Sequence, residues 1–181
     1  QIDNPNSISK CPIRLDQCCS GVAISSMLTG DYRLAAWTNC VGDRKSDLYQ
    51  VVADHVHLEV TKDLQSNPTK KKFAELWLGY GIDRSLMKLP CMTAIYGAQY
   101  LGLVDYLVAR LEEKAPDKMV YDWQHHYLSP ACYLAKIIKL SLDNYLNSSF
   151  RLQKWLKLVA KQVLEQNKKI RWTSPVGWPI E

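Results

Sequence analysis

The 181-residue sequence predicts a mainly α protein with a few short β-strands. Most of the chain carries apolar residues at intervals of three and four, which is the period of an amphipathic helix. Short segments near the two ends combine β-branched residues with Pro or Gly, as strands and turns do. Hydrophobic residues make up 47% and charged residues 23%, which is typical of a folded globular protein. No apolar run approaches the roughly 20 residues of a membrane span.

The first third of the chain predicts one strand and two helices. After a polar lead-in, residues 11–16 (CPIRLD) predict a short buried strand, and a turn at Asp16 leads into a helix within residues 19–28. Residues 43–63 carry apolar residues at near-helical spacing. Asp43 or Ser46 is the expected N-terminal cap of that helix.

The remainder predicts a series of helices and a terminal strand. Helical patterns cover residues 69–81, 83–113, 131–147 and 149–168. Pro90, Gly97 and Gly102 punctuate the second of these patterns, and residues 114–130 are irregular and aromatic. Residues 170–180 contain Pro and Gly and suit a strand and a turn.

The charge balance and the cysteines constrain the partners and the compartment. Lys and Arg outnumber Asp and Glu by 23 to 18, and the net charge of +5 permits an anionic partner without proving one. None of the six cysteines forms a C-x-x-C pair, so the usual zinc spacings are absent and reduced, mostly buried thiols are expected. His55 and His57 would point to different faces of a helix, which disfavours a shared metal there.

A helical stripe of two cations and one aromatic residue is the first candidate site. Arg84 and Lys88 lie four residues apart, so a helix places both on one face, and Tyr96 follows two turns later near the same face. Such a stripe suits a nucleoside triphosphate, because the cations can bind phosphates while the phenol reaches the sugar or base. The alternative from spacing alone is a solvated basic face beside a core tyrosine.

Asp16 is the second candidate. It ends the predicted strand and is followed by small residues up to Gly21. A carboxylate in that position can hold a magnesium ion that bridges phosphate oxygens. Taken alone, Asp16 is better explained as a helix cap or a turn residue.

In combination, the two features resemble the single-subunit RNA polymerases of bacteriophages, mitochondria and linear plasmids. The segment Asp16-x-x-x-Ser20-Gly21 is similar to motif A of that family, and a segment that begins 68 residues after Asp16, Arg84-x-x-x-Lys88-x-x-x-Met92-Thr93-x-x-Tyr96-Gly97, is similar to motif B. Three further patches occur in the family's order: Asp47-Leu48-Tyr49-Gln50-Val51-Val52, Trp77-Leu78-x-Tyr80-Gly81 and Trp172-Thr173-x-Pro175-x-Gly177-Trp178-Pro179. The clear matches cover under half of the chain.

The resemblance implies part of a right-hand polymerase fold, namely a palm piece plus helical fingers. Residues 1–68 would be the palm segment with motif A and the following helix. Residues 69–168 would be the helical fingers with motif B, and residues 169–181 a return strand and turn toward the palm. The implied activity is that of a nucleotidyltransferase in transcription, which adds ribonucleotides from NTPs to the RNA 3′ end on a DNA template.

The resemblance also assigns roles to individual residues. Asp16 would bind both catalytic Mg²⁺ ions, and Gln17 would lend a backbone carbonyl to one of them. Arg84 and Lys88 would hold the incoming triphosphate. Tyr96 would close on the nucleotide and sense the ribose 2′-hydroxyl. Asp16, Lys88 and Tyr96 would form the catalytic set.

Four neighbouring residues receive supporting roles by the same resemblance. Gly97 would let the backbone approach the template base, and Tyr49 would support the sugar pocket. Gly21 stands where related DNA polymerases carry a Glu that blocks a 2′-hydroxyl, and Met92 stands where they carry Phe. Both differences resemble the RNA-making branch.

Two features depart from the family pattern. Pro90 lies inside motif B, where it removes an amide donor and crowds the carbonyl of Leu86, so a kink or break is predicted between Lys88 and Met92. The family's second catalytic Asp belongs to a His-Asp-Ser triplet, which does not occur in this sequence. The chain is therefore expected to need the remainder of the polymerase or a second subunit, and it would not polymerise alone.

Two other classes of protein stay open on the sequence. A catalytically dead nucleic-acid-binding module could keep the basic surface, with residues 70–72 and 168–171 tracking phosphates and an affinity that falls steeply with salt. A helical interaction protein could use the amphipathic helix at 149–168, but that leaves the order of the motifs unexplained. The phage-infected host cytoplasm and the mitochondrial or other organellar matrix are both expected locations, since each is a reducing compartment. No membrane partner is expected.

Overall fold

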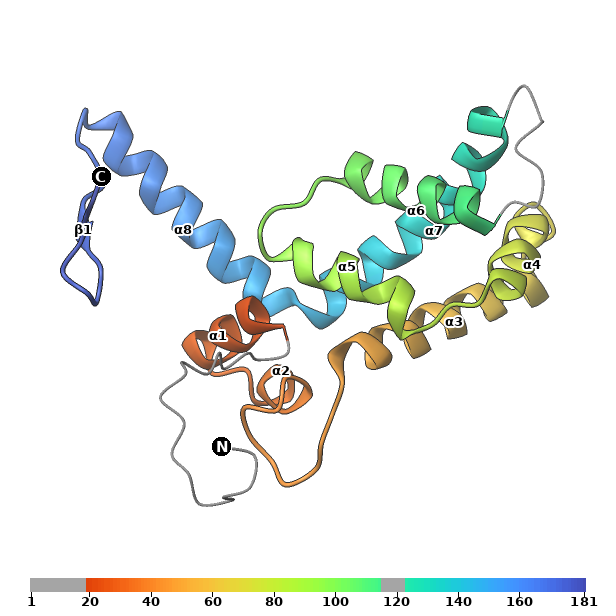
Figure 1. The fold of residues 1–181 in the computed structure, drawn as a ribbon, viewed down its shortest axis with the longest axis horizontal. Coiled ribbons are helices and arrows are strands. Elements are labelled where there is room, and N and C mark those ends of the chain that lie inside the picture. Colours follow the sequence, from red (N-terminus) through yellow and green to blue (C-terminus); the bar gives the residue numbers. More distant parts are fainter. Residues whose placement is uncertain (1–18, 115–122) are drawn as a thin grey trace, which may run out of the picture.

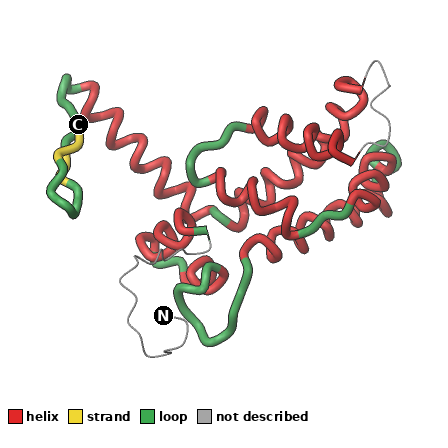
Figure 2. The backbone as a smooth tube through the Cα atoms, viewed as in Figure 1, coloured by secondary structure: helices red, strands yellow, loops and turns green. Residues whose placement is uncertain are grey.

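The computed structural model describes residues 19–114 and 123–181, and within these ranges it contains eight helices and one two-stranded antiparallel sheet. The helices are α1 (Ser20–Thr29), α2 (Tyr32–Trp37), α3 (Leu48–Ser66), α4 (Lys71–Tyr80), α5 (Arg84–Ala94), α6 (Tyr100–Lys114), α7 (Trp123–Tyr145) and α8 (Asn147–Glu165). Strand β1 (Trp172–Thr173) pairs with β2 (Pro179–Ile180). The predicted fold class is confirmed, and Figures 1 and 2 show how few residues are extended. The predicted strand at residues 11–16 lies outside the described residues.

Helix α3 lies at the centre of the packed part of the chain. It packs against α4, α5 and α7, and α6 packs along α7. Leu48, Val52, Val56 and Val60 of α3 recur every four residues and are almost fully buried, so the spacing in the sequence directly determines the buried face. Trp77 of α4 is also fully buried against this core.

Helix α8 leaves this bundle. Figure 1 shows it projecting away from the other helices, with the β1–β2 hairpin beyond its far end. Its first residues contact α1 and the cap of α2: the Ser149 hydroxyl lies 2.6 Å from the Ser25 hydroxyl, and the Ser148 hydroxyl donates to Asp31 at 2.7 Å. None of the described helices is long and apolar enough to cross a membrane.

Two helix starts differ from the sequence prediction. The cap of α3 is Asp47 rather than Asp43 or Ser46, and its carboxylate accepts from the Tyr49 amide at 3.0 Å. Helix α7 begins at Trp123, so part of the segment predicted to be irregular is helical. Pro130 lies buried inside this part of α7, and its carbonyl accepts a hydrogen bond from the Trp77 indole N–H at 2.8 Å.

A helix that the sequence did not predict, α2, follows α1 after a tight turn. Gly30 at the end of α1 has a positive φ of 67°, and Asp31 caps α2 by accepting from the Leu34 amide at 3.1 Å. The helix covers only six residues, so it shows too little periodicity to be recognised in the sequence.

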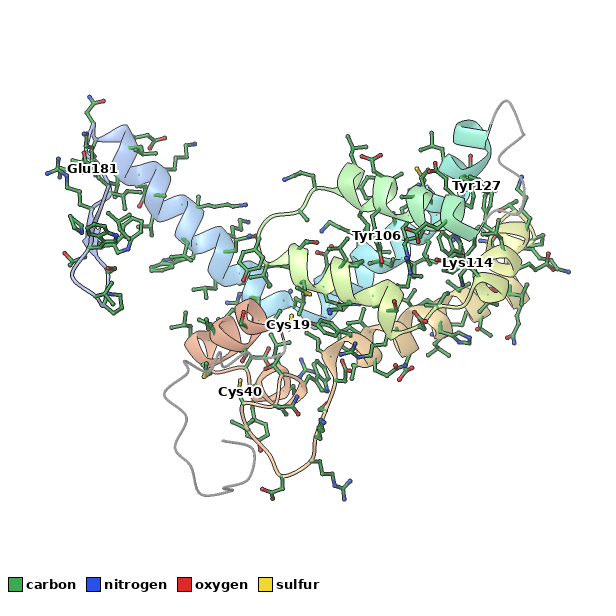
Figure 3. All side chains as sticks on the ribbon, in the orientation of Figure 1. Cys19, Cys40, Tyr106, Lys114, Tyr127 and Glu181 are labelled. Atoms are coloured by element: carbon green, nitrogen blue, oxygen red, sulfur yellow. The ribbon has the colours of Figure 1, made fainter. Side chains whose placement is uncertain are left out.

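Of the predicted kink or break at Pro90, the break is wrong, and the kink stays a prediction. Helix α5 continues through Pro90 and ends at Ala94. Pro90 has no amide for the Leu86 carbonyl, but the Tyr106 hydroxyl donates to that carbonyl at 3.2 Å. Figure 3 labels Tyr106 on α6. The chain leaves the helix only afterwards, in a turn where Gly97 has a φ of 85°.

Removing the Tyr106 hydroxyl should therefore destabilise the protein. Tyr106→Phe leaves the Leu86 carbonyl without its donor in a half-buried position, so the free energy of unfolding should fall by about 1 kcal/mol. Urea denaturation followed by circular dichroism measures this change. Tyr32→Phe is the matched control, because Tyr32 is 68% exposed and should tolerate the same change.

Giving residue 90 an amide provides the decisive comparison. Pro90→Ala supplies an N–H for the Leu86 carbonyl, so Tyr106→Phe should cost less in that background than in the native one. An equal cost in both backgrounds would show that the hydroxyl does not compensate for the proline.

Candidate functional site

Helix α5 and the turn after it carry the residues of the predicted stripe. Asp83 caps α5 by accepting from the Leu86 amide at 2.9 Å, which makes Arg84 the first helical residue. Lys88 follows one turn later and is exposed. Tyr96 lies beyond the end of the helix, in the turn, rather than on a continuous helical stripe.

Arg84 is held against the start of α3. Its guanidinium forms a hydrogen-bonded ion pair with Asp47 and lies 5.1 Å from the centre of the Tyr49 ring. Partial burial tends to raise the pKa of Asp47, but the hydrogen bond and charge of Arg84, together with the Tyr49 amide, outweigh it and the pKa is lowered. The cap of one helix thus orients the first residue of another.

A hollow of about 410 Å³ opens beside this ion pair. Its lining includes Lys45, Tyr49 and Arg84 together with Cys19, the residue before α1. Two cations, the Asp47 carboxylate that pairs with Arg84, and one buried aromatic ring therefore line a space next to the start of α1. The one cation in excess suits a phosphate-bearing ligand.

The second predicted contact lies between the turn after α5 and α1. A Cβ atom on Gly21 would lie 2.9 Å from the Tyr96 hydroxyl oxygen and 3.4 Å from the Ile95 Cγ2 atom. No real side chain tolerates the shorter distance without displacement of the ring. Gly21 is therefore the residue that lets the Tyr96 phenol lie against α1, although Tyr96 is otherwise 75% exposed.

The structure thus brings together two pairs of predicted residues, Arg84 with Tyr49 and Gly21 with Tyr96. Lys88 lies on α5 between the two pairs. Asp16 and Gln17 lie outside the described residues, so their position relative to Arg84 and Lys88 stays a prediction.

The described residues alone do not make a magnesium site. Across residues 19–114 and 123–181, no group of three or more His, Cys, Asp or Glu residues could hold a metal ion. The carboxylate nearest the hollow, Asp47, already accepts from Arg84 and from the Tyr49 amide. Metal binding at this end of α5 would depend on Asp16.

A larger hollow of about 600 Å³ lies on the other side of α5. Leu89, Pro90 and Thr93 line it from α5, and helical periodicity places these residues opposite Arg84 and Lys88. Its position separates it from the predicted triphosphate contacts.

Sequence reasoning missed two residues that act on the site. Asp47 is the ion-pair partner of Arg84, and a cap signal directly before the apolar pattern could have identified it as the start of α3. Gln153 of α8 donates to the Ile95 carbonyl at 2.8 Å. No local pattern marks Gln153, because its partner is 58 residues away in the chain.

Comparison with known proteins identifies the family of the chain. The family model described as DNA-dependent RNA polymerase matches residues 1–181. The chain belongs to this family, and the predicted resemblance to the single-subunit RNA polymerases is confirmed.

Plant organellar enzymes are among the relatives. The mitochondrial DNA-directed RNA polymerase 1B of Nicotiana tabacum is 31% identical over 179 residues, which are 96% of this chain and 17% of the relative. DNA-directed RNA polymerase 2A of the same species is 31% identical over 96% of this chain and 52% of its own length. The chloroplastic/mitochondrial polymerase 2 of Arabidopsis thaliana is 29% identical over 96% of this chain and 17% of its own length.

Removing the Asp47 charge should destabilise the protein only at pH values at which the native carboxyl is ionised. Since the folded-state pKa of Asp47 is lowered, the ion pair contributes stability above the unfolded pKa of about 3.9 and loses it as pH falls through the folded value. Asp47→Asn retains a capping acceptor, so it isolates the charge. Its free energy of unfolding should lie below that of the native chain at about pH 6, and the two should converge below about pH 3.

Denaturation over a pH series tests this expectation. Asp105→Asn is the control, because Asp105 is an exposed carboxylate on a different helix, α6. A difference for Asp47→Asn that persisted unchanged at the lowest pH would show that the side chain contributes through something other than its charge.

Proposed function

We propose that this chain is the NTP-binding part of a DNA-directed RNA polymerase, a nucleotidyltransferase that adds ribonucleotides to the RNA 3′ end on a DNA template. The observation that carries the proposal is that Arg84, at the start of α5, lines the hollow in a chain that belongs to the RNA polymerase family. The chain spans 17% of the length of several of the relatives that it matches. The complete activity would therefore need the remainder of the polymerase or a second subunit.

Arg84 and Lys88 would bind the triphosphate. Arg84 offers a planar fork of donors that Asp47 and Tyr49 already orient, and such preorganised donors bind phosphate oxygens in two-point contacts. Lys88 is an exposed point charge one turn further along the same helix, where it could neutralise charge that develops on the pyrophosphate leaving group.

Tyr96 would recognise the ribose. Its ring lies against Gly21, so a side chain at position 21 would push the phenol out of place. Gly97, with its positive φ, would allow the close backbone approach of a template base, and Tyr49 would support the sugar from beneath Arg84.

Asp16 and the backbone carbonyl of Gln17 would hold Mg²⁺ together with a second Asp from outside this chain. Cys19, which follows Asp16 by three residues in the sequence, lines the hollow, and this supports the assignment. Bound Mg²⁺ would stabilise the attacking and leaving oxygens of nucleotidyl transfer. The role left to the described residues is to bind and orient the nucleotide.

We also propose that the chain forms three parts of a right-hand polymerase fold: a palm segment at residues 1–68, helical fingers at 69–168 and a return segment at 169–181. The organellar matrix is the proposed location, supported by relatives named mitochondrial or chloroplastic. These comparisons lend no support to the phage-infected cytoplasm. The fully buried Cys91 thiol is compatible with a reducing compartment, because burial raises its pKa and keeps it protonated.

Nucleotide binding by the 181-residue chain tests the proposal. A fluorescent ATP analogue with Mg²⁺ should bind, and Lys88→Gln should weaken binding about tenfold, the loss expected for one hydrogen bond to a charged group. Lys136→Gln on α7 is the matched control, since Lys136 is exposed and lies on another helix. Gly21→Glu should also weaken binding of the ribonucleotide, because Tyr96 occupies the space that the new side chain needs.

Two outcomes would contradict the proposal. Equal effects of the Lys88 and Lys136 changes would remove Lys88 from the site. Salt-dependent DNA binding without any Mg²⁺-dependent nucleotide binding would instead favour the catalytically dead nucleic-acid-binding module.

A further inference from the structure

A side chain of α8 reaches the end of α5. The Gln153 amide nitrogen donates to the Ile95 carbonyl at 2.8 Å, in a half-buried position. Ile95 is the C-terminal cap residue of α5, and carbonyls at a helix end have no amide partner within their own helix. Gln153 therefore supplies a hydrogen bond that α5 cannot make for itself.

The base of α8 is already attached to α1 on the same face. Ser149 lies one turn before Gln153, and its hydroxyl contacts the Ser25 hydroxyl at 2.6 Å between two buried side chains. One face of α8 thus contacts both α1 and the end of α5, the two elements that meet where Tyr96 lies on Gly21.

The hydrogen bond to Ile95 bears directly on Tyr96. The Ile95 carbonyl and the Tyr96 amide belong to one planar peptide group. Gln153 holds the carbonyl side of that plane, and the Thr93 carbonyl accepts from the Tyr96 amide on the other side at 3.0 Å. These two bonds hold the peptide plane before Tyr96, and the Gly97 amide, which donates to the Ala94 carbonyl at 3.2 Å, holds the plane after it. The two planes together set the backbone angles at Tyr96 and so the direction of its Cα–Cβ bond.

We propose that Gln153 is a positioning residue for Tyr96, which holds the phenol against Gly21 through the Ile95–Tyr96 peptide plane. Its consequence for the choice between ribose and deoxyribose rests on the function proposed above. Gln153 would not touch the nucleotide, so its loss should loosen Tyr96 without removing any contact of Arg84 or Lys88 with phosphate.

A spectroscopic experiment tests the positioning without any nucleotide. The 181-residue chain is prepared with 3-fluorotyrosine at position 96, and its ¹⁹F resonance is recorded for the native sequence and for Gln153→Met, which keeps the side-chain length but has no donor. The resonance should shift or broaden in this variant. It should return toward the native position in Gln153→Lys, which again carries a donor.

Gln162→Met is the matched control, because Gln162 is an exposed glutamine on the same helix. It should leave the resonance unchanged, and circular dichroism should show that all variants are equally helical. A resonance that does not respond to Gln153→Met, or that Gln153→Lys does not restore, overturns the proposal.

Nucleotide selectivity tests the consequence. The ratio of the Kd for dATP to the Kd for ATP should fall about fivefold in Gln153→Met, because the loss of one neutral hydrogen bond changes affinity by about that factor. The ratio should stay unchanged in Gln162→Met. If Gln153→Met alters the ¹⁹F resonance but leaves the dATP-to-ATP Kd ratio unchanged, the proposed effect of Gln153 on the choice between ribose and deoxyribose is overturned. A native chain that binds neither nucleotide would overturn the proposed function instead, while the ¹⁹F result would still decide the positioning role.

Discussion

Two backbone carbonyls in and just after α5 have no amide partner in that helix, and side chains of two other helices supply their donors. Pro90 leaves the Leu86 carbonyl without an amide, and Tyr106 of α6 supplies the missing donor. The Ile95 carbonyl at the helix end receives its donor from Gln153 of α8. The predicted site residues on α5 and in the turn after it are Arg84, Lys88, Tyr96 and Gly97. These hydrogen bonds therefore help to set the geometry of that part of the candidate site.

The ion pair at the start of α5 acts through orientation more than through stability. Arg84 and Asp47 are exposed by 46% and 36% of their side chains, and pairs at this level of exposure stabilise proteins only slightly. What the pair does is align the guanidinium above the Tyr49 ring, beside the hollow. A triphosphate would meet a cation that is already oriented, while Lys88 keeps the freedom of a solvated side chain.

Membership of the RNA polymerase family does not by itself explain the local structure. Gly21 illustrates the difference. As part of a motif it marks the RNA-making branch by resemblance, and in the structure it is the position at which any Cβ atom would collide with the Tyr96 hydroxyl. The close approach of the Tyr96 hydroxyl is the structural reason for a glycine at this position, while the role given by resemblance stays a prediction.

The sequence by itself determined the helical class, the buried valine face of α3, the four-residue separation of Arg84 and Lys88, and the family resemblance. Each depends on local period or on short motifs, which a linear chain displays directly. Only the tertiary structure decided that α5 continues through Pro90, that Asp47 pairs with Arg84, and that Gln153 holds the Ile95 carbonyl. The partners of these groups lie 20 residues from Leu86, 37 from Arg84 and 58 from Ile95, and side chains that meet only after helices pack leave no periodic signal in the sequence.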